Sequence, residues 1–225
     1  MSFGSDTDYW GFADTRNKLQ SSSRNPTKSE AQCLDSNGDV AAATMYDSFT
    51  EQSCVYRRCH DSAIVLYDTT TSIDFRAGKV IGGYVITGIE VSTNNTERPE
   101  ITISGRSTST ADGSINKYDP TDLEIVGSRK ATKIGATVDS VSKLTGSSGS
   151  LAVNTAIVLD SLGVASCLDV YGGRVEATND YVGCTGDPGA AVDTGWTVSS
   201  GGGDERENTA YGTGSISVFK NLTQM

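Results

Sequence analysis

The fold of this chain is decided by residues 79–91, which read KVIGGYVITGIEV, and by residues 101–105, which read ITISG. In both stretches branched apolar residues alternate with small or polar ones, and this period of two is typical of a strand with one buried face. The same pattern extends over Ile64–Thr108, so we expect sheet throughout that region. Gly82-Gly83 interrupts the longest apolar run and predicts a bulge, or a bend where two sheets meet.

A β-hairpin is predicted upstream of this region. Lys28–Leu34 and Asp39–Tyr46 flank Asn37-Gly38, a dipeptide that supplies the positive φ angles of a tight hairpin turn. The oxygen-bearing residues of Asp35–Asp39 also invite comparison with a calcium loop. An EF-hand requires glycine at its sixth position and glutamate at its twelfth, and the sequence has neither, so the turn is favoured.

Short strands are expected over most of the remaining chain, and one short helix at Thr137–Leu144. In that segment apolar residues recur every three positions behind a possible threonine cap, and Gly146 is placed to end the helix. The fold class is therefore predicted as all-β with one short helix, a β-sandwich or barrel with long loops. The further strands are expected at Ser53–Arg57, Ser62–Tyr67, Lys79–Ser92, Glu100–Thr108, Asp122–Val126, Leu151–Leu159, Ala165–Tyr171, Gly195–Ser199 and Gly214–Leu222.

The chain has 225 residues, which suits one large all-β domain. We expect residues 1–27 to form an N-terminal arm and residues 28–225 to form a single β-sandwich or barrel domain. The arm is polar but carries four aromatic residues with few local partners, so we predict that a neighbouring subunit orders it. These expected assembly contacts are Phe3, Tyr9, Trp10 and Phe12.

The net charge of −10 argues against general affinity for nucleic acid, because neutralising phosphates requires lysine and arginine. Between Asp160 and Ala210 nine acidic residues face two basic ones, so we expect one continuous acidic surface there, either the wall of a DNA passage or a solubilising exterior. Its members are Asp160, Asp169, Glu176, Asp180, Asp187, Asp193, Asp204, Glu205 and Glu207. The basic cluster Arg129–Lys133 is interpreted as a solvated loop.

Few residues suggest catalysis. The chain has one histidine, His60, and no G-x-S-x-G motif, which argues against a Ser-His-Asp triad. A hydrolase that uses two carboxylates stays open, because acidic residues are abundant. The five cysteines are expected to be free thiols in a reducing compartment, and a zinc site at Cys54, Cys59 and His60 has the wrong ligand spacing. We therefore expect no enzyme activity, no cofactor and no metal.

No stretch resembles a membrane span or a secretory signal, which predicts synthesis and retention in a cytoplasm unless the chain is exported within a larger particle. A carbohydrate- or surface-binding module of β-sandwich type is an alternative function. In that case Tyr9, Trp10 or Trp196 would stack on the ligand.

Taken together, the order of these segments resembles the major tail, or tail-tube, proteins of bacteriophages. The resemblance rests on the arm, the hairpin Lys28–Tyr46, the strands at 79–91 and 101–105, the short helix and the closing glycine-rich strand at 211–218. It implies a β-sandwich or barrel with a flanking helix. It also implies a virion protein, made in the host cytoplasm, that assembles into stacked rings, contacts other virion proteins and lets DNA pass without specific binding. The chain length and the five cysteines leave a capsid decoration or tail-tip role open.

Overall fold

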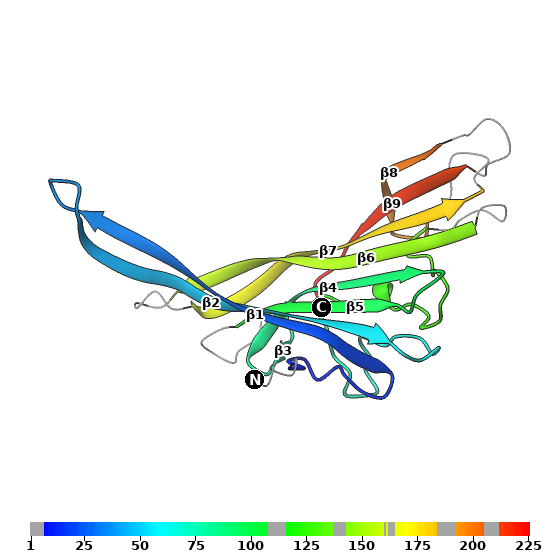
Figure 1. The fold of residues 1–225 in the computed structure, drawn as a ribbon, viewed down its shortest axis with the longest axis horizontal. Helices are drawn as coiled ribbons and strands as arrows, with labels where there is room; N and C mark the ends of the chain where they lie inside the picture. Colours follow the sequence, from blue (N-terminus) through cyan, green and yellow to red (C-terminus); the bar gives the residue numbers. More distant parts are fainter. Residues whose placement is uncertain are drawn as a thin grey trace, which may run out of the picture.

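The computed structural model describes residues 7–107, 116–136, 143–159, 161, 165–183, 192–204 and 212–225. Its strands form one antiparallel sheet of nine strands in the order β1-β2-β5-β4-β6-β7-β9-β8, and the short β3 pairs with β4 (Figure 1). The all-β fold class is confirmed. The strands are β1 Asn17–Leu34, β2 Val40–Arg58, β3 Val80–Ile81, β4 Tyr84–Asn94, β5 Glu100–Ser107, β6 Lys143–Leu159, β7 Ala165–Val182, β8 Thr197–Asp204 and β9 Thr213–Asn221.

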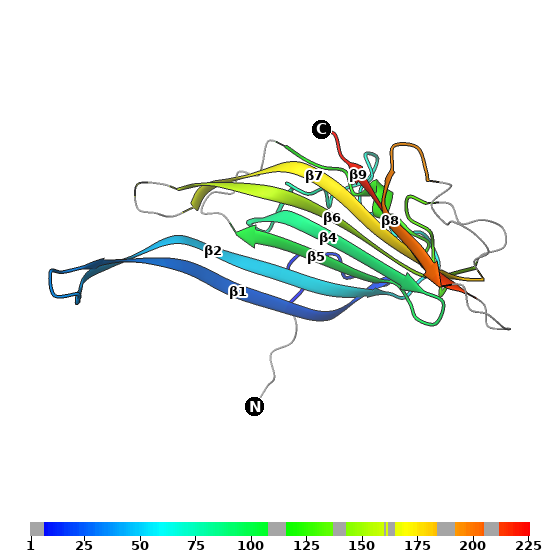
Figure 2. The same cartoon turned by 90° about the horizontal axis from the view of Figure 1, so that it is seen from above.

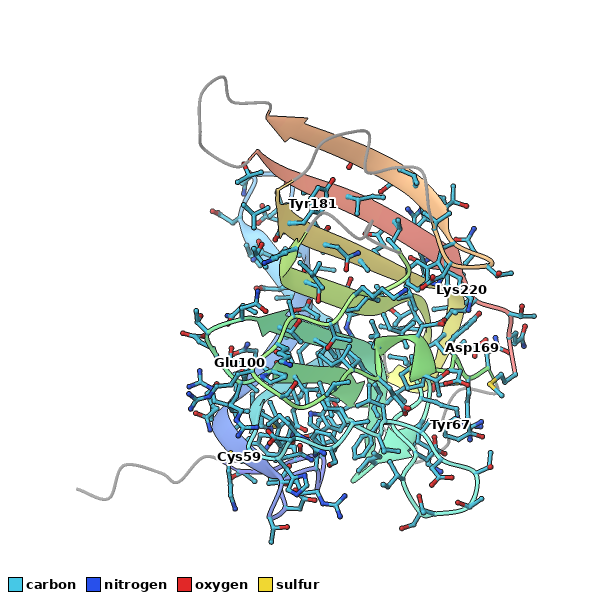
Figure 3. The ribbon with its side chains drawn as sticks, turned by 90° about the vertical axis from the view of Figure 1, so that its right-hand side faces the viewer. Cys59, Tyr67, Glu100, Asp169, Tyr181 and Lys220 are labelled. Carbon is cyan, nitrogen blue, oxygen red and sulfur yellow. The ribbon has the colours of Figure 1, made fainter. Side chains whose placement is uncertain are left out.

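One face of the sheet is covered by irregular segments, and we call residues 7–16, 59–79, 116–136 and 192–196 the loop layer. In the described part of the chain, this layer occupies the place of a second sheet. Its apolar side chains complete the core with Ile89, Ile103 and Leu151 of the sheet, and Figure 3 shows the side chains that fill the space between them. The buried members of the loop layer include Trp10, Phe12, Ile64, Leu66, Phe75, Tyr118, Leu123, Ile134 and Trp196.

Glycines in the strands make room for the large side chains of the loop layer. A Cβ atom on Gly105 would lie 2.5 Å from the Trp10 ring, and one on Gly173 would lie 2.3 Å from the Tyr118 ring. Such distances are far below van der Waals contact, so these strand positions exclude any larger residue. The glycines thereby fix where the loop layer packs against the sheet.

The predicted hairpin is confirmed and is longer than expected, because β1 pairs with β2 from Asn17↔Arg58 to Leu34↔Val40. Gly38 has a φ of +86°, as the tight turn requires. Beyond the pair Glu51↔Arg106 the two strands pair only with each other among the described strands. We call this two-stranded part, residues 26–50, the distal ribbon. It projects from the body of the molecule (Figures 1 and 2).

Gly82-Gly83 forms the turn of a hairpin between β3 and β4, so the predicted bend between two sheets is wrong. The two glycines have φ values of +59° and +85°, which suit a two-residue turn that requires positive φ at both positions. The flanking residues Ile81 and Tyr84 pair across this turn. The apolar run therefore reverses direction within one sheet.

Three other segments differ from expectation. The helix predicted at Thr137–Leu144 is wrong at its end, because Lys143 and Leu144 belong to β6, while residues 137–142 lie outside the described part. The strand predicted at Asp122–Val126 begins as a 3-10 turn, Thr121–Leu123. The strand predicted at Ser62–Tyr67 makes only isolated bridges. These segments are apolar because they cover the sheet, and a covering loop shows the same short apolar runs as a strand.

No boundary separates an arm from a domain at residue 27. β1 begins at Asn17 and continues through residue 27 to Leu34, paired with β2 except at local register shifts. The expected arm of residues 1–27 therefore includes 11 of the 18 residues of the edge strand β1. Cross-strand pairing, which a single sequence does not reveal, decides this arrangement.

Candidate functional site

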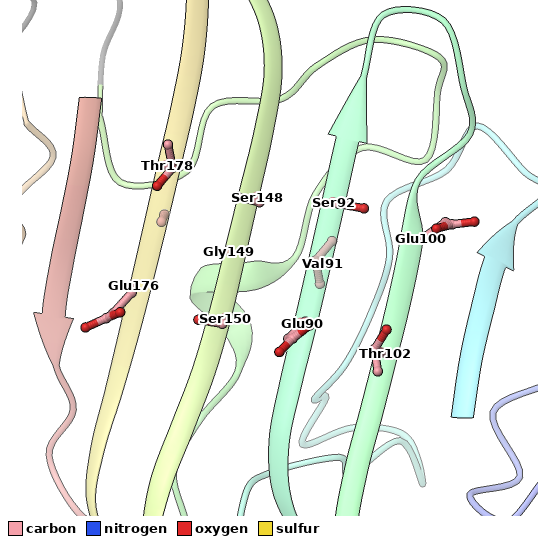
Figure 4. A pocket seen from close by; sticks show the side chains of 11 residues that line it. Glu90, Val91, Ser92, Glu100, Thr102, Ser148, Gly149, Ser150, Glu176 and Thr178 are labelled. Atoms are coloured by element: carbon pink, nitrogen blue, oxygen red, sulfur yellow. The ribbon is translucent and has the colours of Figure 1, made fainter. Parts of the chain in front are cut away.

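The sheet face opposite the loop layer is polar, because alternation in the central strands sends the branched residues inward. In β4, Ile89 and Val91 are buried while Glu90 and Ser92 are exposed. Two rows of outward residues cross β5, β4, β6 and β7 by direct pairing. We call these residues the polar face (Figure 4): Thr102, Glu90, Ser150 and Glu176 in one row, and Glu100, Ser92, Ser148 and Thr178 in the other.

The polar face is shallow and carries an excess of negative charge. It forms an open hollow of about 330 Å³. Glu100 forms an ion pair with Arg57 at one side, and Glu176 forms an ion pair with Arg174 at the other, with 2.8 Å between Oε1 and Nε. Glu90, at the centre, forms no ion pair with any residue that the structure describes. Hydroxyls and carboxylates of this kind hold water and repel a polyanion.

The same polar character continues across β5 to β2. A second hollow of about 280 Å³ is lined there by Ser53, Ser104 and other polar residues. Arg106 closes its end through a 2.9 Å ion pair with Glu51 and a 3.0 Å hydrogen bond to Thr155 Oγ1. The polar surface therefore extends over at least five neighbouring strands. Arg57, Arg106 and Arg174 at its edges each form an ion pair with a glutamate.

The described members of the predicted acidic surface do not all lie on one side of the sheet. Glu176 and Asp180 are exposed on the outward side of β7, whereas Asp193 lies in the loop layer and approaches Lys133 at 3.8 Å. Asp169 also takes an outward position in β7, because it lies between the buried Leu168 and Val170 and pairs with the exposed Ala156. Asp204 ends β8. The other predicted members, Asp160, Asp187, Glu205 and Glu207, lie outside the described residues.

The acids that sequence reasoning missed are Glu90 and Glu100, which lie far from Asp160–Ala210 in the chain. Strand order β5-β4-β6-β7 brings them beside Glu176. The sequence does carry a signal for these two residues. Each lies at an outward position of a strand in which buried and more exposed residues alternate. A count of acids along the chain does not detect such a surface, because the sheet collects it from three separate segments.

Two of the predicted assembly aromatics are core residues, so that prediction is wrong for Trp10 and Phe12. Trp10 is 2 % exposed and donates from Nε1 to Ile103 O at 2.9 Å, and Phe12 is 7 % exposed. Tyr9 is partly buried against the same core, and Phe3 lies outside the described residues. Tyr9, Trp10 and Phe12 thus pack against the sheet of their own chain.

The Asp8 carboxylate explains why this segment folds back. It accepts hydrogen bonds from Gly11 N at 3.0 Å, from Ala13 N at 2.8 Å and from the Tyr56 hydroxyl at 2.5 Å. Burial and this hydrogen bond raise the pKa of Tyr56, so the phenol stays protonated. One side chain thus closes the turn and ties it to β2.

The aromatic platform proposed for sugar binding is buried as well. Trp196 is 8 % exposed and packs on Gly135, where a Cβ atom would lie 2.3 Å from the indole. Neither Trp10 nor Trp196 therefore presents a ring face to solvent. The two tryptophans named for a carbohydrate-binding module are therefore unavailable for stacking, whereas Tyr9 is only partly buried.

The cysteines show no disulfide in the described part of the chain. Cys33, Cys59 and Cys167 are exposed and Cys54 is buried, whereas Cys184 lies outside the described residues. Within the described ranges no cluster of histidine, cysteine and acidic side chains is arranged to hold a metal ion.

The comparisons with known proteins identify no relative, because no protein-family model and no curated protein matches the chain. Across the described ranges, no helix has the length and apolar character needed to cross a membrane.

Proposed function

We propose that this chain is a structural subunit of a phage tail tube, which self-assembles into stacked rings around a DNA passage and has no catalytic role. The polar face carries the proposal. Its hydroxyl and carboxylate groups present DNA with hydrated, negatively charged groups, and its neighbouring arginines are paired with glutamates. A wall of this composition repels phosphate and leaves the duplex free to move.

The edges of the sheet support self-assembly. β1 and β8 lie at the two ends of the strand order, so each has one side without a partner strand among the described residues. A long open edge is a template for pairing with another chain, and a closed ring of subunits removes such edges. The curved sheet would then place its polar face toward the axis and its loop layer outside.

The test begins with electron microscopy of the purified protein, where tubes or stacked rings are expected. The position of the polar face is then measured with two matched variants, Ser148→Cys on the polar face and Ser72→Cys in the loop layer. Both serines are exposed in the single chain. Cys33, Cys59 and Cys167 are first replaced by serine so that each variant carries one accessible described thiol.

A maleimide attached to a bulky polymer is expected to label both variants in the monomer. In assembled tubes it should label Ser72→Cys and leave Ser148→Cys unmodified, because the polymer does not enter a narrow lumen. Equal labelling of the two variants in tubes would refute the assignment of the polar face. A protein that stays monomeric at high concentration would refute the tube, and isolated rings without stacking would favour the tail-tip alternative.

A further inference from the structure

The tip of the distal ribbon combines an exposed apolar pair with a one-sided charge. Leu34 and Val40 oppose each other across the hairpin and are 57 % and 54 % exposed. Exposed side chains of this size at the end of a projecting ribbon indicate a contact surface. Residues 29–50 contain four acids, Glu30, Asp35, Asp39 and Asp47, and no lysine, arginine or histidine.

A surface of opposite charge lies in the loop layer, at residues 126–133, which we call the basic loop. Val126 is 46 % exposed, and the segment carries Arg129, Lys130 and Lys133 without an acidic residue. The loop is held at the end of β4, where Ala131 N donates to the Asn95 side chain at 2.9 Å. It thus repeats the composition of the ribbon tip, an apolar residue beside charges, with the sign reversed.

The two surfaces lie at opposite ends of the molecule. β2 runs from the ribbon tip to Arg58, and its last residues pair with the start of β5, next to the turn that follows β4. The basic loop is tied to that same end through Asn95. In Figure 1 the ribbon tip lies at the left end of the long axis and the end of β4 lies toward the right.

Two cations of the basic loop have no ion-pair partner among the described residues, although other charged residues lie nearby. Lys133 approaches Asp193 at 3.8 Å, and Arg98 pairs with Asp61. Glu97 is the exposed acid in the adjoining turn. Arg129 and Lys130 are exposed and form no ion pair with any residue in the described ranges.

We infer that the ribbon tip of one copy docks on the basic loop of a second copy, head to tail along the long axis. This inference rests on the self-assembly in the proposed function and names the contact that joins successive rings. Leu34 and Val40 cover Val126, while Asp35 and Asp39 meet the basic residues beside it. A heterologous contact of this kind repeats without closing and so propagates a tube.

The ribbon itself gives a physical reason for the contact. From Pro26 to Leu34 it extends about 27 Å at the rise of an antiparallel strand. A two-stranded ribbon is marginally stable alone in water, because neither face is covered. Docking its tip on a second copy buries the apolar pair and reduces the repulsion among its acids.

The test uses two charge variants that are mixed. Asp35→Asn combined with Asp39→Lys gives the turn residues 35–39 a net charge of +1 in place of −2. The turn is kept, since the Asp35 side chain accepts from Asn37 N and Asp39 N and an asparagine oxygen accepts the same bonds. Arg129→Glu combined with Lys130→Glu makes the loop acidic. Circular dichroism checks that each variant folds, and sedimentation velocity with electron microscopy follows assembly.

Each variant alone is expected to need about tenfold more protein to form tubes, because like charges then meet at the contact. An equimolar mixture should recover assembly, since a basic tip meets an acidic loop at one interface and an unaltered tip meets an unaltered loop at the next. Tubes from either variant alone at the unaltered concentration, or a mixture no better than its components, would overturn the contact and leave the tube itself standing. Absence of any assembly by the unaltered chain would overturn both proposals.

Discussion

Replacing Trp10 tests whether residues 7–13 belong to the core of their own chain or to a contact with a neighbour. The indole is buried over Gly105, meets the Tyr84 ring edge-on with centroids 6.2 Å apart, and donates to the Ile103 carbonyl. Trp10→Ala removes all three interactions. Trp10→Phe keeps an aromatic ring and removes the N–H donor.

The expected losses follow from these contacts. Trp10→Ala should lower the free energy of unfolding by about 3–5 kcal/mol, the usual effect of truncating a buried tryptophan, since a void opens over the sheet. Trp10→Phe should lower it by about 1–2 kcal/mol, because a buried hydrogen bond is lost while most apolar packing remains. Tyr171→Ala is the control: this ring is 49 % exposed, so its loss should change stability by less than about 0.5 kcal/mol.

Urea unfolding is measured at a protein concentration below that of assembly, by circular dichroism and by tryptophan fluorescence, which in the Trp10 variants comes from Trp196 alone. The midpoint should move to lower urea in the order Tyr171→Ala, Trp10→Phe, Trp10→Ala, with unfolding slopes that stay similar. A Trp10→Ala chain that unfolds at the unaltered midpoint yet fails to assemble would refute the core assignment. Trp10 would then act as an anchor in a neighbouring subunit.

Three further predictions concern pH, close packing and thiol accessibility. The Arg76 guanidinium donates two hydrogen bonds to the Asp74 carboxylate and lowers its pKa to about 2. The pair should therefore add about 2 kcal/mol to the free energy of unfolding above pH 4, and this contribution should be lost as the pH falls toward 2. Asp74→Asn should remove this pH dependence from acid unfolding curves. Gly173→Ala should cost more than about 2 kcal/mol in urea, because its Cβ would overlap the Tyr118 ring, and an unchanged midpoint would contradict this packing. Cys54 should react with a thiol reagent only after denaturation, as followed by mass spectrometry, because it is buried, and rapid native labelling would contradict that burial.

The parts of the fold that follow from local chemistry were predictable. The alternation in residues 79–91 and 101–105 specifies strands with one apolar face, and Asn37-Gly38 specifies a hairpin turn. The apolar runs near Ile64 and Leu123 predict strands that the fold does not contain, because a segment that covers a sheet shows the same short apolar run as a strand. Their hydrogen bonds go to loops and side chains, such as Leu66 N to the Glu124 carboxylate at 2.7 Å, and no periodicity records such partners.

The candidate site was less predictable, since its residues come from strands far apart in the chain. A β-sheet protein with an excess of acidic residues follows from the sequence alone, because strand pattern and net charge are properties of local order and composition. Tertiary structure alone decided that Trp10 and Phe12 lie in the core and that Glu90, Glu100 and Glu176 share one face. The physical reason is that strand order and register are set by long-range packing, which places residues side by side irrespective of their separation in the chain.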